Sequence, residues 1–360
     1  MQDYERFHAT MRYAALDRKV FAKPWLGFPE TMERWEREGM RPGDIEAWGT
    51  DSWHWIGHWF FPHPPFEHEV LEDDGRHITY VNHEGILMRE LKDNPMGSMP
   101  QFLRFPVETS ADFRIFAKER LQPDVGARIG GDWVKTLKDL RAQPATFFCI
   151  ADRWGGFFGP LRNLMGVENL CMAFYTDPAL VEEMMDTIAD FIIAQVGEIL
   201  DHVELDCFGL WEDMAFNHGP LIGPELVRQY MLPRYKRVVE YVKGRGVPWV
   251  CLDSDGKVDD LIPIWVDAGI DLLYPFEVAA GMDVAAVRKE YGKDLRLYGG
   301  LDKRPLVEGP EAIDREIDCI RPLLEEGGYI PNIDHSVPPD VSWAHMCYYV
   351  EKMRQVLGID

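Results

Sequence analysis

Short apolar runs alternate with helix-like segments through the second half of the chain, and this alternation limits the folds open to it more than any other feature. Each run has the length of a buried strand, whereas the segments between the runs carry apolar residues at three- and four-residue spacing. The longest such segment follows Thr176-Asp177-Pro178, which supplies a capping side chain and a proline suited to a first helical turn. The expected strands are residues 145–150, 207–210, 248–252, 270–274, 295–298 and 329–333, and the expected helices are 180–200, 224–243, 258–268, 284–291 and 312–325.

Repeated strand–helix units predict right-handed crossovers and therefore a parallel sheet. The number of units favours an α/β fold, a (β/α)8 TIM barrel. A doubly wound open sheet is the alternative, but no Gly-x-Gly-x-x-Gly sequence follows any expected strand.

The first half of the chain is less regular. Residues 69–72 and 76–81 read as two short antiparallel strands joined at Asp73-Asp74-Gly75, which predicts a β-hairpin inserted near the mouth of the barrel. No linker rich in Pro, Gly or Ser divides the chain. We therefore expect one domain over residues 1–360, a barrel with an N-terminal elaboration that includes the hairpin.

The charge balance excludes some classes of partner. The chain has 38 Lys and Arg against 61 Asp and Glu, a formal net charge of −23, which would repel nucleic acid and anionic membranes. No apolar run reaches the roughly 20 residues of a spanning helix, and no signal peptide is visible. Six scattered cysteines do not suggest a disulfide framework. These features predict a cytoplasmic enzyme with a small-molecule substrate.

An acidic residue follows every expected strand. Because the carboxyl ends of barrel strands converge on one face, these residues are expected to meet at an active site. Asp favours turns and helix starts after strands, which could explain about half of the set, but Glu212 and Glu277 escape that explanation. The residues are Asp152, Glu212, Asp213, Asp253, Asp255, Glu277, Asp302 and Asp334, with His335 beside the last.

Crowded carboxylates must be protonated, paired with cations or bound to a metal. Asp253, Asp255 and His335 form the most natural ligand set, with Glu212 or Glu277 nearby. Oxygen ligands with one imidazole suit zinc, manganese or magnesium, and zinc is our first choice. The alternative is a metal-free acidic pocket neutralised by Arg153, Lys257, Lys303 and Arg304.

An aromatic-rich stretch runs from Trp53 to Phe66. His54 and His58 would have metal-ligand spacing on a helix, but three prolines interrupt the segment and no acid supports ligation. We expect Trp53, His54 and Trp59 to form an aromatic wall for the substrate.

Taken together, these motifs resemble the uroporphyrinogen decarboxylase superfamily, which also contains cobalamin-dependent methyltransferases and O-demethylases. The resemblance runs nearly from end to end and implies a (β/α)8 barrel. Its marks are Ala14-Ala15-Leu16-Asp17-Arg18-Lys19-Val20, Glu30-Thr31-Met32-Glu33-Arg34-Trp35, Phe157-Phe158-Gly159-Pro160-Leu161-Arg162, Leu164-Met165-Gly166, Trp211-Glu212-Asp213-Met214, Asp253-Ser254-Asp255-Gly256, Gly299-Gly300-Leu301-Asp302, Gly327-Gly328-Tyr329-Ile330 and Pro338-Pro339-Asp340.

Departures from the family patterns narrow the function that the resemblance implies. The Arg-rich motif with which the decarboxylases grip their carboxylated substrate is missing from the N-terminal region. The thiol-directed methyltransferases carry His-x-Cys-Gly and a late Cys, where this chain has Asp253-x-Asp255-Gly256 and His335. Harder ligands suit Lewis-acid activation of an oxygen. The resemblance therefore implies methyl transfer from an O- or N-methylated small molecule to a corrinoid carried on a partner protein.

The expected roles follow from this reading. The alternatives are decarboxylation, of porphyrinogen type or of a smaller acid held by Arg153 or Arg162, and a non-catalytic binding barrel. The predicted catalytic residues are Glu212, Asp213, Glu277 and Asp302; the predicted metal ligands are Asp253, Asp255 and His335; and the predicted substrate contacts are Trp53, His54, Trp59, Asp152, Arg153, Trp154, Arg162 and Lys303.

Overall fold

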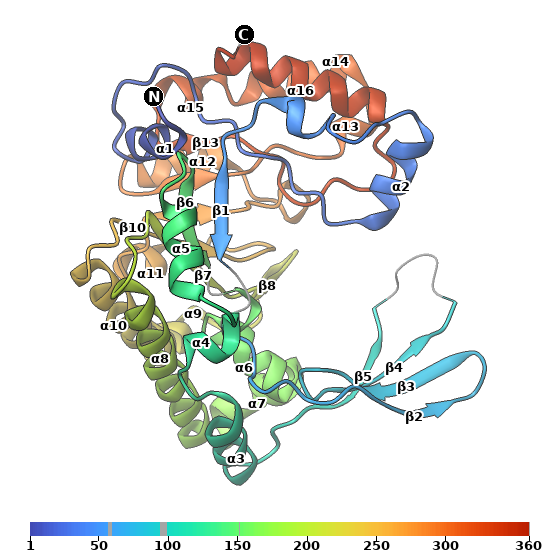
Figure 1. Cartoon of the computed structure of the whole chain (residues 1–360), viewed down its shortest axis with the longest axis vertical. Helices are drawn as coiled ribbons and strands as arrows, with labels where there is room; N and C mark the ends of the chain where they lie inside the picture. The colour runs from blue at the N-terminus through green and yellow to red at the C-terminus, as the bar shows by residue number, and fades with distance from the viewer. Residues whose placement is uncertain (57–59, 94–98, 151, 360) are drawn as a thin grey trace.

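A curved sheet of seven parallel strands forms the centre of the computed structural model, which describes residues 1–56, 60–93, 99–150 and 152–359 (Figure 1). Its strand order is β1-β6-β7-β10-β11-β12-β13, and each neighbouring pair is parallel. The strands are β1 (Trp53–Ile56), β6 (Thr146–Ile150), β7 (Cys207–Trp211), β10 (Trp249–Asp253), β11 (Leu272–Tyr274), β12 (Arg296–Tyr298) and β13 (Tyr329–Ile330).

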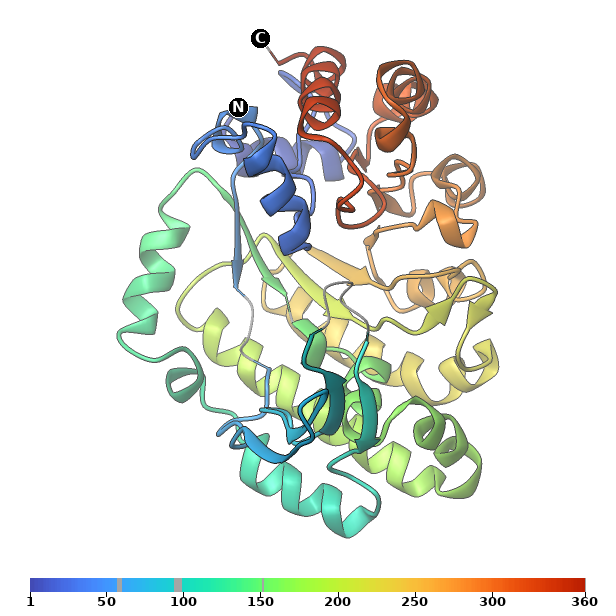
Figure 2. The same cartoon turned by 90° about the vertical axis from the view of Figure 1, so that its right-hand side faces the viewer.

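Helices cover the outside of this sheet (Figure 2). A π-helical turn, Val227–Met231, joins α9 to α10, so the expected helix over residues 224–243 is nearly continuous, whereas the expected helix over 312–325 is divided between α14 and α15. The helices are α1 (Asp3–Met11), α2 (Pro29–Arg37), α3 (Ser110–Arg120), α4 (Val125–Ile129), α5 (Trp133–Arg141), α6 (Phe158–Met165), α7 (Val167–Thr176), α8 (Pro178–Leu200), α9 (Pro224–Leu226), α10 (Leu232–Gly244), α11 (Ile262–Asp267), α12 (Val284–Tyr291), α13 (Pro305–Glu308), α14 (Pro310–Cys319), α15 (Arg321–Glu326) and α16 (Trp343–Leu357).

The sheet differs from the expected eight-stranded barrel at one place. Among the described residues, no strand pairs β13 with β1. The extended segment around residues 20–25 lies at this opening, since the Phe21 carbonyl accepts a hydrogen bond from Asp51 N before β1 and the Trp25 carbonyl accepts one from Val337 N after β13. The fold is therefore of the TIM-barrel type with seven paired strands. Strand β1 itself was missed in the sequence, where its Trp and His residues read as an aromatic wall.

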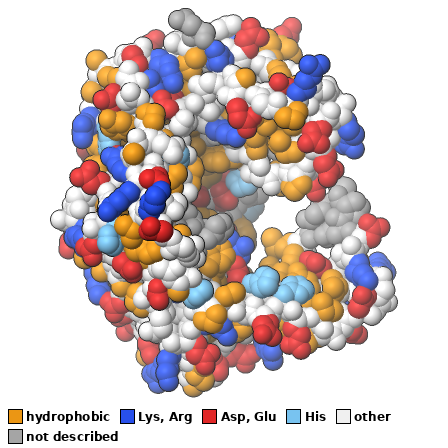
Figure 3. Space-filling view, in the orientation of Figure 1, with side chains coloured by type: hydrophobic (Ala, Val, Ile, Leu, Met, Phe, Trp, Pro, Cys, Tyr) orange, Lys and Arg blue, Asp and Glu red, His pale blue; other side chains and the backbone are white. Residues whose placement is uncertain are grey.

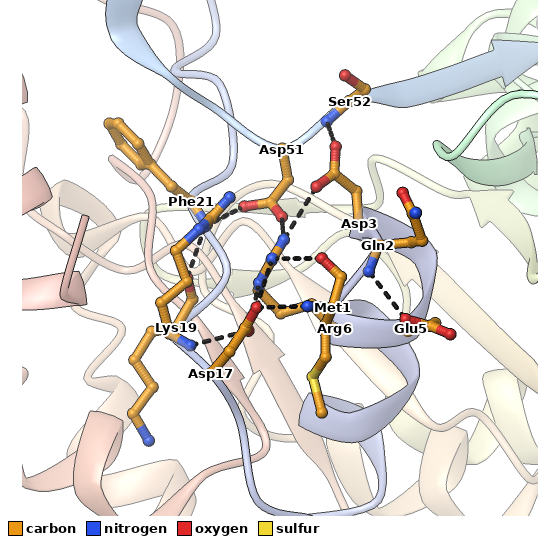
Figure 4. Close-up of polar contacts among 11 residues, drawn as sticks. Met1, Gln2, Asp3, Glu5, Arg6, Asp17, Lys19, Phe21, Asp51 and Ser52 are labelled. Carbon is orange, nitrogen blue, oxygen red and sulfur yellow. Dashed lines mark hydrogen bonds and ion pairs between the residues drawn. The ribbon is translucent and has the colours of Figure 1, made fainter. Parts of the chain in front are cut away.

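Helix α1 closes the amino-terminal end of the sheet. Its Phe7 and Met11 belong to the apolar cluster inside the sheet's curve. Arg6 on the same helix is almost fully buried and contacts the carboxylates of Asp3, Asp17 and Asp51 (Figure 4). Asp51, which directly precedes β1, is thereby tied to the helix.

A second, antiparallel sheet stands off from the barrel (Figure 1). Where the sequence predicted a hairpin, the structure has four strands: β2 (Glu69–Asp73), β3 (His77–Val81), β4 (Leu87–Leu91) and β5 (Gln101–Arg104). The β3–β4 turn reaches the barrel through Glu84, whose carboxylate lies 3.2 Å from Arg153 Nη2 and accepts a 3.5 Å hydrogen bond from Trp154 Nε1. We call this four-stranded unit the lobe.

None of the helices in the described part of the chain has both the length and the apolar character needed to cross a membrane.

Candidate active site

Three potential metal ligands meet just beyond the carboxyl ends of the barrel strands. Asp255 follows β10, Glu277 follows β11 and His335 follows β13, and one ligand atom from each lies within 4.8 Å of the other two. His335 Nε2 is 3.4 Å from Asp255 Oδ2, and Glu277 Oε2 accepts a 3.0 Å hydrogen bond from Gly256 N. Figure 3 shows acidic and histidine side chains inside a hollow between the barrel and the lobe. We refer to Asp255, Glu277 and His335 as the ligand cluster.

Electrostatic repulsion within the ligand cluster favours a bound cation. Burial raises the pKa of Glu277, and the neighbouring charge of Asp255 raises it further. The hydrogen bond to Asp255 is the largest cause of the raised pKa of His335. A positive charge among these side chains would relieve the repulsion between the two carboxylates.

Lys303 links the ligand cluster to Asp334, a buried acid that the sequence analysis placed among the acids after the strands without giving it a catalytic, metal-binding or substrate-binding role. Its Nζ lies 3.8 Å from Glu277 Oε1 and 3.7 Å from Asp334 Oδ1. Asp334 is fully buried, and its carboxylate also accepts hydrogen bonds from Val278 N and Lys303 N. Its position directly before His335 is the feature of the sequence that could have identified Asp334 as a residue of the site. Lys303 was predicted to contact substrate; the structure places it beside the cluster.

Asp253 is not among the three residues of the ligand cluster, and its predicted role as a ligand stays a prediction. Its charge raises the pKa values of Tyr274 and Tyr298, two members of the apolar cluster inside the barrel. Burial, followed by the charge of Asp255, raises the pKa of Asp253 well above its usual range. The two acids also differ in position, because residue 253 is the last residue of β10 whereas residue 255 lies beyond the strand.

Glu212 accepts hydrogen bonds from the start of a helix, and its predicted role as a catalytic acid stays a prediction. The side chain has no exposed surface. Its two oxygens accept hydrogen bonds from Phe157 N (2.8 Å), Phe158 N (2.6 Å) and Gly159 N (3.3 Å) at the start of α6, and from Tyr235 Oη (2.7 Å). Burial raises the pKa of Glu212 to about 7, although the hydrogen bonds to its carboxylate act in the opposite direction and lower the pKa. Tyr235 was not predicted, since residues 212 and 235 meet only through the packing of α10.

Asp213 is held by an arginine of α6. Arg162 Nη1 lies 2.8 Å from Asp213 Oδ2 and donates a 2.9 Å hydrogen bond to the Asp213 carbonyl oxygen. The guanidinium also lies over the Trp211 ring, 5.2 Å from its centroid. Arg162, predicted to bind substrate, is thus already paired.

Asp302 is also paired with an arginine, and its predicted catalytic role stays a prediction. Arg304 Nε and Nη2 contact its two carboxylate oxygens at 2.9 and 2.7 Å. Two parallel charge-assisted hydrogen bonds hold this acid strongly and leave it poorly suited to exchange protons.

The structure places the remaining predicted substrate-contact residues in different parts of the fold. Trp53 packs inside the barrel against Phe7, Phe148 and Tyr298, and the His54 ring lies edge-on to Phe147. Trp154 is buried, and Arg153 contacts the lobe through Glu84. Trp59 lies outside the described residues, and Asp152 begins a short 3-10 turn whose first side chain is not described.

Comparison with known proteins gives a consistent family signal. The family model described as uroporphyrinogen decarboxylase (URO-D) matches residues 137–356. A uroporphyrinogen decarboxylase of Rhodococcus erythropolis is 32% identical over 192 residues, 51% of this chain and 49% of the relative. A methylated-thiol–coenzyme M methyltransferase of Methanosarcina mazei is 27% identical over 179 residues, 49% of this chain and 46% of the relative. The chain thus spans about half the length of these curated relatives.

A solved structure described as a methyltransferase from Methanosarcina mazei shares the fold. It has a TM-score of 0.63 at 16% identity and covers 98% of this chain and 99% of that one. At this identity the likeness extends to the fold alone.

Proposed function

Because the chain belongs to the uroporphyrinogen decarboxylase family, we propose that it is a methyltransferase that moves a methyl group from an O- or N-methylated small molecule to a corrinoid held by a partner protein. The ligand cluster of Asp255, Glu277 and His335 is the observation that carries this proposal. Two carboxylates and one imidazole form a hard ligand set at the end of the barrel where such enzymes hold their active sites. The methyltransferase among the sequence relatives adds support.

The cluster fits a divalent cation, with zinc our first choice. Its donor atoms are close enough to share one ion. In the absence of a cation, the negative charge of Asp255 destabilises the charged form of Glu277. Asp255, Glu277 and His335 would hold the metal. The metal would supply a positive charge for the oxygen or nitrogen from which the methyl group departs.

The surrounding residues have supporting roles in this proposal. Lys303 holds its ammonium between Glu277 and Asp334, where Nζ can donate a proton to a leaving oxygen. The half-exposed ring of Trp55 is stacked on Phe148. Asp253 and this ring would lie against the methylated substrate. Glu212 and Arg162 position the turn that carries Trp211 and Asp213.

Decarboxylation of a carboxylic acid is the second candidate. The uroporphyrinogen decarboxylases among the relatives favour it. The charge balance around the cluster opposes a substrate with many carboxylates, since Arg162 pairs with Asp213, Arg304 with Asp302 and Lys303 lies between two acids. A substrate with one or two carboxylates remains compatible with this site.

Elemental analysis of the purified chain tests the metal assignment. We expect about one divalent ion per chain, and we expect Asp255→Ala and His335→Ala to lose it. Asp302→Asn is the matched control, because it changes an acid that follows a barrel strand but is held by Arg304. Asp253→Ala should also keep its metal. Loss of metal in the Asp302 and Asp253 variants, with retention in the other two, would refute the ligand assignment.

Turnover assays test the reaction itself. Methoxylated aromatics and methylated amines, each with a reduced corrinoid acceptor, are compared with uroporphyrinogen. Methyl transfer that is lost in His335→Ala supports the proposal. Decarboxylation of uroporphyrinogen by the unaltered chain, without methyl transfer, would replace it with the second candidate.

A further inference from the structure

Aromatic rings gather inside the barrel, close to the carboxyl ends of its strands. Tyr274 and Tyr298 are the last residues of β11 and β12, and their ring centroids lie 5.5 Å apart. The ring of Trp25 lies 5.0 Å from that of Tyr298, and the ring of Trp53 on β1 lies 5.4 Å from it. Since β1 and β12 are not neighbours in the sheet, these contacts cross the interior. We call the following set the aromatic layer: Trp25, Trp53, Trp55, Phe148, Tyr274 and Tyr298.

Part of the aromatic layer is accessible to a ligand. Phe148 and Tyr298 are each only 2% exposed, whereas Trp55 is 44% exposed. Trp25 and Trp53 are half-buried. The Trp55 ring is stacked on Phe148 with their centroids 4.9 Å apart, so packing already fixes the orientation of this exposed ring.

An unpaired carboxylate adjoins the aromatic layer. Asp253, the last residue of β10, is opposite Tyr274 in the strand register, so the two side chains point to the same face of the sheet. That face is the interior one, because Cys251, two residues earlier on β10, belongs to the apolar cluster inside the barrel. No residue in the part of the chain that the structure describes donates a hydrogen bond to the Asp253 carboxylate or forms an ion pair with it.

Aromatic faces beside an unpaired carboxylate favour a cationic ligand. The face of a Trp or Tyr ring attracts an ammonium group, and the attraction is stronger where water is excluded. A carboxylate in the same place adds attraction for the same charge. The net charge of −23 attracts cations to the molecule as a whole. The methyl group of an ether brings no full charge to these features.

We propose that the barrel interior binds a quaternary ammonium compound against the aromatic layer and Asp253, and that this compound is the methyl donor. The second part rests on the proposed methyl transfer and selects nitrogen as the atom that loses the methyl group. Transfer breaks one N–C bond, leaves its electron pair on nitrogen, and forms a bond from the methyl carbon to the reduced corrinoid of the partner. The amine departs uncharged, so no proton has to be supplied.

The ligand cluster then has a different role from assisting the departing atom. A quaternary nitrogen has no lone pair to give a metal ion. The cation proposed for Asp255, Glu277 and His335 would therefore bind an oxygen-bearing group elsewhere on the substrate.

Isothermal titration calorimetry of the full-length chain tests the cation site with two probes of the same shape. Choline carries a trimethylammonium group, and 3,3-dimethyl-1-butanol has a carbon atom in place of the charged nitrogen. We expect choline to bind and the uncharged alcohol to bind at least tenfold more weakly, because only the cation is attracted to the rings and the carboxylate. Equal affinities, or no binding of choline, would overturn the proposal.

Variants of the aromatic layer and of Asp253 locate the bound cation. Trp55→Leu should weaken choline binding at least tenfold, whereas Trp55→Phe, which keeps a ring, should retain most of it. Asp253→Asn should weaken choline binding without changing the affinity for the uncharged alcohol. Tyr175→Leu, a control on α7 where Tyr175 is 74% exposed, should bind choline like the unaltered chain. Unchanged choline affinity in both Trp55→Leu and Asp253→Asn would refute the proposed site.

Turnover with a reduced corrinoid acceptor separates failure of this inference from failure of the proposed methyl transfer. Demethylation of choline that is lost in Trp55→Leu supports both. Methyl transfer from methoxybenzene but from no quaternary ammonium compound would keep the methyltransferase and overturn the choice of nitrogen. Choline binding that depends on Trp55, without methyl transfer from any donor, would keep the cation site and refute the methyltransferase.

Discussion

The buried carboxyl of Glu212 predicts a measurable pH dependence of stability. Its pKa in the folded chain is about 7, compared with 4.5 for an ordinary Glu side chain. The folded state therefore binds this proton more tightly than the unfolded state does. Stability from this group is complete below pH 4.5 and is lost as the pH rises through about 7, since the buried carboxylate then becomes charged.

The size of the effect follows from the two pKa values. One unit of pKa shift corresponds to about 1.4 kcal/mol, so the free energy of unfolding should fall by about 2–3 kcal/mol between about pH 5 and about pH 8 through this group alone. Glu212→Gln removes the titration. The variant should be less stable at low pH, because its amide cannot accept from all four donors, and its stability should fall less as the pH rises.

Urea denaturation at several pH values measures the difference. The free energy of unfolding of Glu212→Gln is subtracted from that of the unaltered chain at each pH, which cancels the contributions of other titrating groups. Tyr235→Phe is a second arm, because loss of its hydroxyl donor should raise the pKa of Glu212 and move the transition to higher pH. Parallel curves for the unaltered chain and Glu212→Gln would refute the reasoning.

Three further predictions follow from individual contacts. Arg6→Met should lower the free energy of unfolding by about 3–5 kcal/mol, because it leaves the buried carboxylate of Asp51 with one fewer cation; thermal denaturation measures this. Gly156→Ala should destabilise the fold strongly, since its Cβ would collide with a backbone oxygen at the end of β7. In the chain stripped of metal by a chelator, Asp255→Asn should lower the pKa of His335, because the hydrogen bond that raises it is weakened; an NMR titration of the imidazole measures the change.

Each of these predictions has its own control. Arg18→Met removes the more exposed of the two arginines that contact Asp51 and should cost less than the change at Arg6. Gly244→Ala lies at a helix end with open space around it and should leave stability nearly unchanged. Asp302→Asn should not move the His335 titration. Equal losses in the two glycine variants would contradict the steric argument.

The sequence by itself determined the order of strands and helices in the second half of the chain. Apolar runs of buried-strand length between amphipathic segments correspond to β6, β7, β10, β11, β12 and β13 within a few residues. This succeeds because burial on both faces of a parallel strand leaves a continuous apolar run, which is a local signal. Strand β1 was missed, because its alternating Trp and His residues do not form such a run.

The tertiary structure decided which of the acids after the strands face one another. Backbone direction changes abruptly at Asp213 and Phe276, whose φ angles are +43° and +61°, so the alternation of side chains along a strand does not continue past its end. Glu277, which follows Phe276, turns to Asp255 and His335, whereas Glu212, which precedes Asp213, is held at the start of α6 by hydrogen bonds from Phe157 N and Phe158 N. The composition of the site was visible in the sequence, but its partition into ligands, helix caps and ion pairs depends on contacts between residues far apart in the chain, which no local pattern encodes.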